Sequence, residues 1–506
     1  MPWYIVLLSI MGTQASAITF LSAPGQAYTD GMRFVQYYFG LPIAMVVISI
    51  FFVPVFKKLK IYTAYEFLET RFDVKTRSLT SALFLISRGL STGISIYAPS
   101  IILSSLLGWN IYYTNIVMGG LLIIYTMSGG AKAVAYTQQL QLIIIITGMF
   151  LAGFMVVKLL PANMGFTEAL KSAGQVGKMN IITSGMGANG FDWKDKYNMW
   201  SGVIGGFFLA LSYFGTDQSQ VGRYLTSKNE KESRIGLLMN GLIKVPMQFL
   251  ILIVGVLVFS FYQYHKAPIY FDEVKVVAAK KTIYKDSLLL VENNYNIALQ
   301  SSNHKGADEQ RKAYKNLLKK ALPGDDANDT NFIFLRFVID NLPKGLVGLL
   351  IAVIFLAAWG SIAAALNSLA SCTVVDFHKK FINTNLTEKE DYSIARWYTF
   401  AWGVFSVIIA MFAHNIGNSL IEAVNILGSL FYGVILGIFL VAFWIKKVDG
   451  NAIFTGAIIS EVLVIVVYKM DMVSFLWLNV IGALLVIIMS VIIQFGISLK
   501  SLTGNK

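Results

Sequence analysis

The chain has 506 residues, of which 56% are hydrophobic and only 14% are charged, and its mean hydropathy is +0.63. Its repeated apolar runs exclude a soluble domain, because about 20 apolar residues at 1.5 Å per residue cross the hydrocarbon layer of a bilayer. The net charge of +13 does not indicate nucleic-acid binding, since the Lys and Arg residues are spread over loops between the apolar runs. A single cysteine, Cys372, excludes an intrachain disulfide framework.

The apolar runs predict an all-α polytopic membrane protein with about twelve transmembrane helices. Their centres are expected near residues 12, 45, 91, 119, 146, 211, 250, 358, 403, 431, 459 and 485. Basic residues concentrate in alternate loops, which the positive-inside rule places in the cytoplasm together with both ends of the chain.

Two longer loops, 159–197 and 264–331, are then expected outside the cell. The second loop carries charges of both signs with helical spacing, which is typical of a solvated helical insertion over the outer mouth. A lid or a partner site is the alternative for this loop.

The first span contains an unusual polar stretch, GTQASAITFLSAPG (12–25). Polar side chains are costly in a bilayer unless they face protein or water, so the stretch is compatible with a helix that unwinds at the midplane and offers free carbonyl groups. Close packing of small residues against another helix is an equally good interpretation of this stretch alone.

The sixth span repeats the interruption at Gly215, Thr216, Asp217 and Gln218. Matching breaks in the first and sixth of ten helices are what an inverted five-helix repeat produces, and this architecture is characteristic of secondary transporters. The eighth span has a further polar stretch of small residues in which Ser361 could offer a hydroxyl group to a cation.

Several stretches resemble the sodium/solute symporter family, nearest its branch of sialic acid, iodide, multivitamin and monocarboxylate transporters. They are FLSAPGQAYTDG (20–31), FVPVFKKLKIYTAYEFLETRFDVKTR (52–77), IIYTMSGGAKAVAYTQ (123–138), GTDQSQVGRYL (215–225) and LNSLASCTVVDFHKK (366–380). The resemblance covers essentially the whole chain except 264–331, and it implies a LeuT-like core that works by alternating access.

The resemblance also implies the organisation of the chain. Residues 1–158 would form the first inverted repeat, 198–445 the second, and 450–497 two accessory helices. Members of the family usually have one more helix before the broken one, and this first helix is apparently missing here.

A sodium site common to the fold uses carbonyl groups of the first helix and oxygens of the eighth. The matching positions are Gly12, Ala15, Ala357, Gly360 and Ser361. Typical members have hydroxyl groups at the last two positions, so Gly360 removes one oxygen. Packing of small residues is the alternative for these positions.

A second sodium site in the sialic acid branch matches Gln138, Ala363 and Ala364, where neither the charge nor the hydroxyl groups are present. We therefore expect this second ion to be absent, and one sodium ion to move per cycle if sodium is used.

The resemblance places the solute against Gln14, Ser16, Thr19 and Arg88, with Arg88 matching the arginine that holds a carboxylate in sialic acid transporters. An arginine in mid-span is costly and its fork fits a carboxylate, which supports this role independently. The alternatives are that Arg88 pairs with Glu422 or Asp217, or extends toward water.

Lys244 lies beside Pro246 in the seventh span, where a kink would let its side chain reach the cytoplasmic side. A role in coupling is the alternative for this lysine.

The sequence therefore predicts sodium-coupled symport of a small organic solute across the cell membrane, with a carboxylate such as sialic acid as the candidate. A transporter-like sensor and a symporter no longer coupled to sodium are the alternatives. No enzyme motif is visible, the four histidines show no metal-ligand spacing, and we expect no cofactor besides Na⁺ as the coupling ion.

Overall fold

The computed structural model describes residues 1–503 except 189, 302, 326 and 414–418, and the side chains at 129–137, 139–140, 304 and 500–503 lie outside the description. All elements up to Lys158 are helical. They comprise α1 (Trp3–Gln14), α2 (Ala17–Asp30), η1 (Gly31–Tyr38), α3 (Leu41–Val47), η2 (Ile48–Phe52), α4 (Val53–Leu59), α5 (Glu66–Arg71), α6 (Val74–Leu107) and α7 (Ile111–Lys158).

A loop segment follows and then the second set of spans. The loop holds α8 (Phe166–Gln175) and a short hairpin of β1 (Met186–Gly187) and β2 (Gly190–Phe191), which pair antiparallel. The chain continues through η3 (Ser201–Gly205), α9 (Gly206–Gly215), α10 (Gln218–Leu225), α11 (Glu230–Tyr264), α16 (Lys344–Cys372), η5 (Thr373–Ile382), α17 (Glu388–Phe412), α18 (Leu420–Trp444), α19 (Gly450–Lys469) and α20 (Phe475–Thr503).

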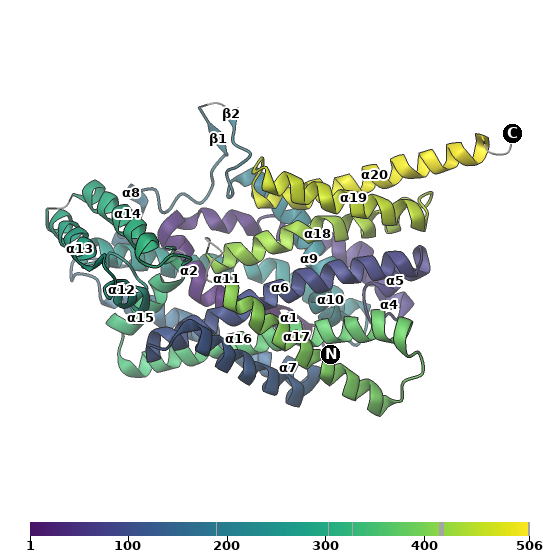
Figure 1. The fold of residues 1–506 in the computed structure, drawn as a ribbon, viewed down its shortest axis with the longest axis horizontal. Coiled ribbons are helices and arrows are strands. Elements are labelled where there is room, and N and C mark those ends of the chain that lie inside the picture. Colours follow the sequence, from purple (N-terminus) through teal and green to yellow (C-terminus); the bar gives the residue numbers. More distant parts are fainter. Residues whose placement is uncertain (189, 302, 326, 414–418, 504–506) are drawn as a thin grey trace.

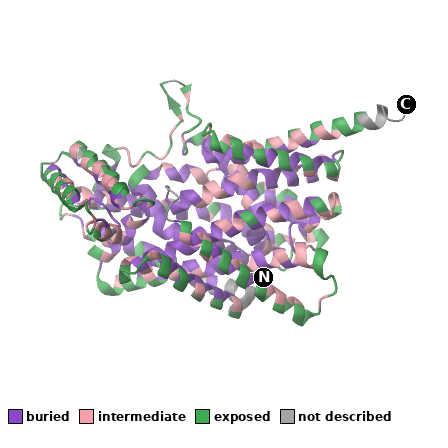
Figure 2. Cartoon of the chain, in the orientation of Figure 1, coloured by how far each residue is buried: buried purple, intermediate pink, exposed green. Residues whose placement is uncertain are grey.

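Within the described residues, ten helical segments are long and apolar enough to cross a membrane, and two further apolar helices are shorter. The short ones are α1 and Ser201–Gly215, and each forms half of an interrupted span. The all-α polytopic fold with about twelve spans is therefore confirmed. Figure 2 shows the buried residues gathered in the middle of the bundle, while exposed residues cover its outer helices and the ends.

Helix α7 contains two of the expected spans in one continuous helical element. Its first part packs against α17, with Gly119 on Val407 and Gly403 on Ile123, and its second part packs against α16, with Gly148 on Leu350 and Val353. Contacts of Thr373 with Trp402 and of His378 with Tyr398 show that α16 with η5 runs antiparallel to α17. The two parts of α7 therefore pack against different helices, which run antiparallel to each other.

Between α11 and α16 the chain forms a helical insertion with its own small apolar core. It comprises α12 (Glu273–Ala279), α13 (Lys285–Gln300), α14 (His304–Ala321), η4 (Thr330–Phe332) and α15 (Ile333–Asn341). Figure 1 shows α12, α13 and α14 together at one end of the bundle, opposite the end where α4 and α5 lie.

A buried carboxylate ties this insertion together. Asp329 accepts hydrogen bonds from Lys315 at 2.6 Å, Arg311 at 3.1 Å and the backbone N–H of Phe271 at 3.0 Å. The adjoining Thr330 carbonyl packs so closely on Gly25 that a Cβ there would lie 2.0 Å from it. The insertion is thus anchored on α2, directly above the first span.

Asp272 gives the insertion a measurable pH dependence. It caps α12 by accepting from the backbone N–H of Lys275 at 3.2 Å, and burial raises its pKa from 3.8 to about 6. Because the folded state binds this proton more tightly than the unfolded chain, the contribution of Asp272 to the stability of the insertion is fully present below about pH 4 and is lost as the pH rises to 6.

We expect Asp272→Asn to remove this loss, because an asparagine keeps the cap without the buried charge. The gain at pH 8 over the wild type is at most about 3 kcal/mol for a shift of two pKa units. Thermal unfolding of the purified protein at pH 5 and pH 8 measures it. Asp272→Ala, which also removes the cap, should be less stable than the asparagine variant at both pH values, and equal stability of the two would contradict this account.

Candidate functional site

The first span is interrupted at Ala15 and Ser16. Helix α1 ends at Gln14, Ala15 has φ −75° and ψ 71°, and Ser16 is extended before α2 begins at Ala17. The last carbonyl groups of α1 and the first N–H groups of α2 therefore lie outside a helical ladder. One of them is used locally, since the Thr19 hydroxyl donates to the Gln14 carbonyl at 3.3 Å. The expected break near Gln14 is confirmed.

The sixth span is interrupted at Thr216 and Asp217, between α9 and α10. The Asp217 carboxylate caps α10 by accepting from the Ser219 backbone N–H at 2.8 Å and its hydroxyl at 2.6 Å. The free Thr216 carbonyl accepts from the Tyr65 hydroxyl at 3.0 Å. This second break is also as expected from the sequence, and its Thr216 carbonyl is satisfied inside the protein.

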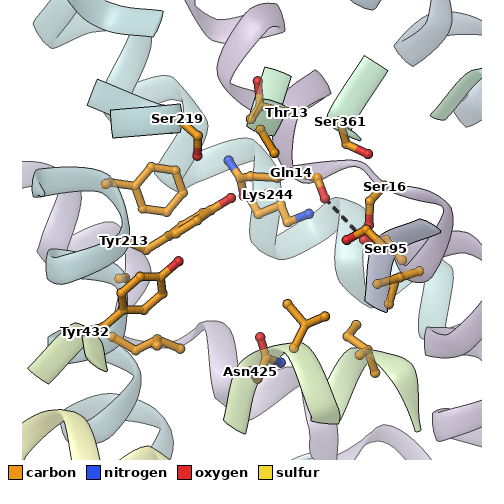
Figure 3. Close-up of a pocket in the computed structure, with 18 of the residues that line it drawn as sticks. Thr13, Gln14, Ser16, Ser95, Tyr213, Ser219, Lys244, Ser361, Asn425 and Tyr432 are labelled. Carbon is orange, nitrogen blue, oxygen red and sulfur yellow. Dashed lines mark hydrogen bonds between the residues drawn. The ribbon is translucent and has the colours of Figure 1, made fainter. Parts of the chain in front are cut away.

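A cavity of about 160 Å³ lies between the two breaks. Its polar lining comes from α1, α2, η1, α6, α9, α10, α11, α16 and α18, and consists of Thr13, Gln14, Ser16, Thr19, Tyr37, Tyr38, Arg88, Thr92, Ser95, Tyr213, Ser219, Lys244, Ser361, Asn425 and Tyr432. All four residues predicted to bind the solute therefore line one cavity. Figure 3 shows Gln14 and Lys244 on one side of this space and Asn425 on the other.

Arg88 from α6 pairs with Asp217, so one of the alternatives considered for it is what the structure shows. The same Asp217 oxygen accepts from the Tyr432 hydroxyl at 2.8 Å, and Arg88 Nη2 also donates to that hydroxyl at 3.1 Å. Glu422 is not a partner of Arg88, since it pairs with Lys196. The Nε atom of Arg88 is fully buried and has no hydrogen-bond partner among the described residues, and the guanidinium group lies 5.3 Å from the centre of the Tyr213 ring.

Lys244 is buried and faces the cavity, so the expectation that it reaches the cytoplasmic side is wrong. Only 2% of the residue is exposed, and its ammonium group lies 5.7 Å from the centre of the Tyr38 ring. Among the described residues it has no carboxylate partner. A sequence signal was available, because Asn240, Lys244 and Gln248 recur at every fourth position of α11 and thus share one face.

The residues matched to a sodium site are only partly brought together at the cavity. Ser361 lines it, and its hydroxyl donates to the Ala357 carbonyl at 2.9 Å, so two candidate oxygens are adjacent. Gly12, Ala15, Ala357 and Gly360 are not part of the cavity wall. Gly12 and Gly360 instead contact the side chain of Gln138.

No group of three or more His, Cys, Asp or Glu side chains that could hold a metal ion occurs within the described part of the chain. His414 and the side chain of His304 lie outside that part. Any cation bound near the first break would therefore be held by neutral oxygens, which suits a monovalent ion.

Two interrupted helices around a polar cavity are the arrangement of a secondary active transporter with LeuT-like architecture. A sequence model of the Sodium:solute symporter family matches residues 1–284 and 313–460, and the chain belongs to this family. The stretch that the match leaves out falls within the helical insertion. The resemblance read from the motifs is confirmed.

Similar proteins cover the chain almost completely. The Sodium/sialic acid symporter NanT of Aliivibrio fischeri is 26% identical over 96% of this chain and 84% of its own length. The Sodium/sialic acid symporter SiaT of Proteus mirabilis is 25% identical over 96% and 86%. The rabbit Sodium-dependent multivitamin transporter is 27% identical over 86% of this chain and 58% of its own length.

A solved structure of a Na⁺-coupled sialic acid symporter in its substrate-bound outward-open state shares the fold. Its TM-score is 0.77 at 24% identity, covering 98% of this chain and 90% of that one. The family and these relatives are transporters, and with the apolar helices they make this chain a multi-pass protein of the cell membrane.

We expect Asp217→Asn to destabilise the protein strongly, because it keeps the cap of α10 but leaves Arg88 as a buried charge without a counter-ion. Breaking such a pair from one side costs about 3–5 kcal/mol. Asp195→Asn is the matched control, since the Arg33–Asp195 pair is partly exposed and its loss should cost less than about 1 kcal/mol. Equal thermal shifts for the two purified variants would contradict a buried role for Asp217.

Proposed function

We propose that this protein is a sodium-coupled symporter of a small organic anion with a carboxylate group. The observation that carries the proposal is the charge of the cavity wall. Arg88 and Lys244 line it, and no acidic residue does so among the described residues. Since Asp217 neutralises Arg88 from behind, one positive charge is left for a solute to balance.

Two directed groups are available to the carboxylate. The buried Nε–H of Arg88 has no hydrogen-bond partner among the described residues and can donate to one carboxylate oxygen, and the Lys244 ammonium is a point charge that can approach the second oxygen. Gln14, Ser16 and Thr19 offer an amide and two hydroxyl groups at the break of the first span, which suits a polyhydroxylated acid such as sialic acid. The sialic acid symporters among the relatives support this class of solute.

The sodium ion is proposed at the junction of the first break with α16. The Ser361 hydroxyl and the Ala357 carbonyl are adjacent there, and the end of α1 adds the carbonyl groups of Gly12 and Ala15. These neutral oxygens fit Na⁺, while Gly360 contributes no side-chain oxygen. Sodium bound there would hold α1 against α16 and so favour the conformation that binds the solute.

We propose the organisation of the chain into repeats from its resemblance to the family. Residues 1–158 and 198–445 would form the two inverted repeats, with 450–497 as accessory helices and 264–331 on the extracellular side. Alternating access then exposes the cavity to one side of the bilayer at a time.

The proposal predicts uptake of a labelled carboxylate such as sialic acid into proteoliposomes when sodium, but not potassium, is supplied outside. Uptake that is unchanged when potassium replaces sodium would favour a symporter that is not coupled to sodium. Binding of the solute without any uptake would favour a sensor.

Ser361→Ala should raise the sodium concentration needed for half-maximal uptake by roughly tenfold, about 1.4 kcal/mol, because one ligand oxygen is lost. Ser368→Ala is the matched control. Ser368 lies on the same helix and makes the same bond to a carbonyl group four residues earlier, at 2.9 Å, but it does not line the cavity. An unchanged sodium requirement in Ser361→Ala would remove Ser361 from the site.

Lys244→Met should raise the KM for a carboxylate solute by tenfold or more, because methionine keeps much of the apolar stem without the charge. Uptake of the uncharged amide of the same solute, where it is measurable, should not fall in the variant. An equal loss for acid and amide would show that Lys244 acts through packing and not through its charge.

A further inference from the structure

Gln138 occupies the junction between the broken first span and α16. The residue is fully buried, and its amide Nε2 donates to the Gly360 carbonyl at 3.0 Å and to the Thr13 hydroxyl at 3.4 Å. Its Oε1 accepts from the Ser9 hydroxyl at 3.4 Å. One side chain thus joins α1, α7 and α16 at the height of the first break.

Two glycines make room for this side chain. A Cβ on Gly12 would lie 2.8 Å from Cβ of Gln138, and a Cβ on Gly360 would lie 3.2 Å from its Cγ and 2.4 Å from Oε1 of Gln141. A hydroxyl residue at position 360 would therefore displace the Gln141 amide and press on the Gln138 side chain. The absence of a side chain at Gly360 therefore leaves room for the amide of Gln138.

This arrangement does not fit a second sodium ion. The group that faces the Gly360 carbonyl is an N–H donor, which presents a partial positive charge where a cation would need an oxygen. Ala363 and Ala364 are buried and bring no side-chain oxygen. The residues present can bridge the helices by hydrogen bonds but cannot form an anionic or hydroxyl-rich cage.

We propose that the Gln138 amide is a permanent tie between the first span and α16 that takes the place of a second coupling cation. The tie holds α1 in position whether or not sodium is bound, so the protein binds a single sodium ion per transport cycle. The inference rests on the proposed sodium coupling for its stoichiometry, whereas the tie itself is independent of it.

Hydrogen exchange tests the tie on the full-length purified protein. In sodium-free buffer the backbone of α1 should be protected in the wild type, and Gln138→Leu should exchange there at least tenfold faster. Gln248→Leu is the matched control, because this glutamine is equally buried and neither amide atom has a hydrogen-bond partner among the described residues. Wild-type protection in Gln138→Leu, or equal loss in both variants, would overturn the proposal.

Sodium binding tests the stoichiometry. Titration of the purified protein with ²²Na⁺ should give one ion per chain for the wild type. Gln138→Glu places a carboxylate of the same size beside the Ser9 and Thr13 hydroxyl groups and the Gly360 carbonyl, so it should bind two ions. Two ions in the wild type, or one in Gln138→Glu with α1 protected as in the wild type, would overturn the proposal.

The two experiments separate this inference from the proposed function. If the wild type binds no sodium and its uptake does not depend on sodium, the proposed sodium-coupled function is wrong. The hydrogen-exchange comparison would still decide whether Gln138 is the tie. Should Gln138→Leu fail to fold, the titration of Gln138→Glu and of the wild type decides the proposal.

Discussion

The structure depends on how it satisfies backbone groups that two interrupted helices release in the middle of a membrane. An unsatisfied backbone group in hydrocarbon costs several kcal/mol, so such a break is tolerated only where protein or a water-filled cavity receives it. At the second break, Tyr65 takes the Thr216 carbonyl and Asp217 takes the N–H of Ser219. At the first, the Gln14 carbonyl accepts from the Thr19 hydroxyl. The proposed sodium site would use the neighbouring carbonyl groups of Gly12 and Ala15.

The charged residues around the cavity connect elements that are far apart in sequence. Arg88, Asp217 and Tyr432 link α6, the second break and α18, while Lys244 approaches from α11. Burying a charge is costly, so the pairing of Arg88 with Asp217 reduces the penalty, while the Nε–H group of Arg88 stays without a partner among the described residues. Lys244 has no such partner among the described residues. A carboxylate solute would supply the missing negative charge, which makes solute binding and charge balance the same event.

The sequence predicted what depends on local pattern. Polar residues within apolar runs located both breaks, and family motifs brought Gln14, Ser16, Thr19 and Arg88 to one cavity. What depends on distances between spans was not predictable from one sequence. Asp217 and Glu422 were equally reasonable partners for Arg88, and only packing decides between them. The position of Lys244 does not follow from the nearby Pro246, whereas the polar face that it shares with Asn240 and Gln248 indicates it.

The number of coupling ions sets the maximal concentration gradient that a symporter of a monovalent anion can build. One sodium ion moving with one monovalent anion transfers no net charge, so the membrane potential, worth about 2.3 kcal/mol per charge at 100 mV, adds nothing to the driving force. Accumulation is then limited by the sodium ratio alone. A second cation would add both its own gradient and the potential, but it would also have to be released in every cycle. A glutamine amide holds the same helices without that release. An anion transporter with Gln138 therefore reaches a lower maximal solute gradient, but its helix junction needs no bound ion.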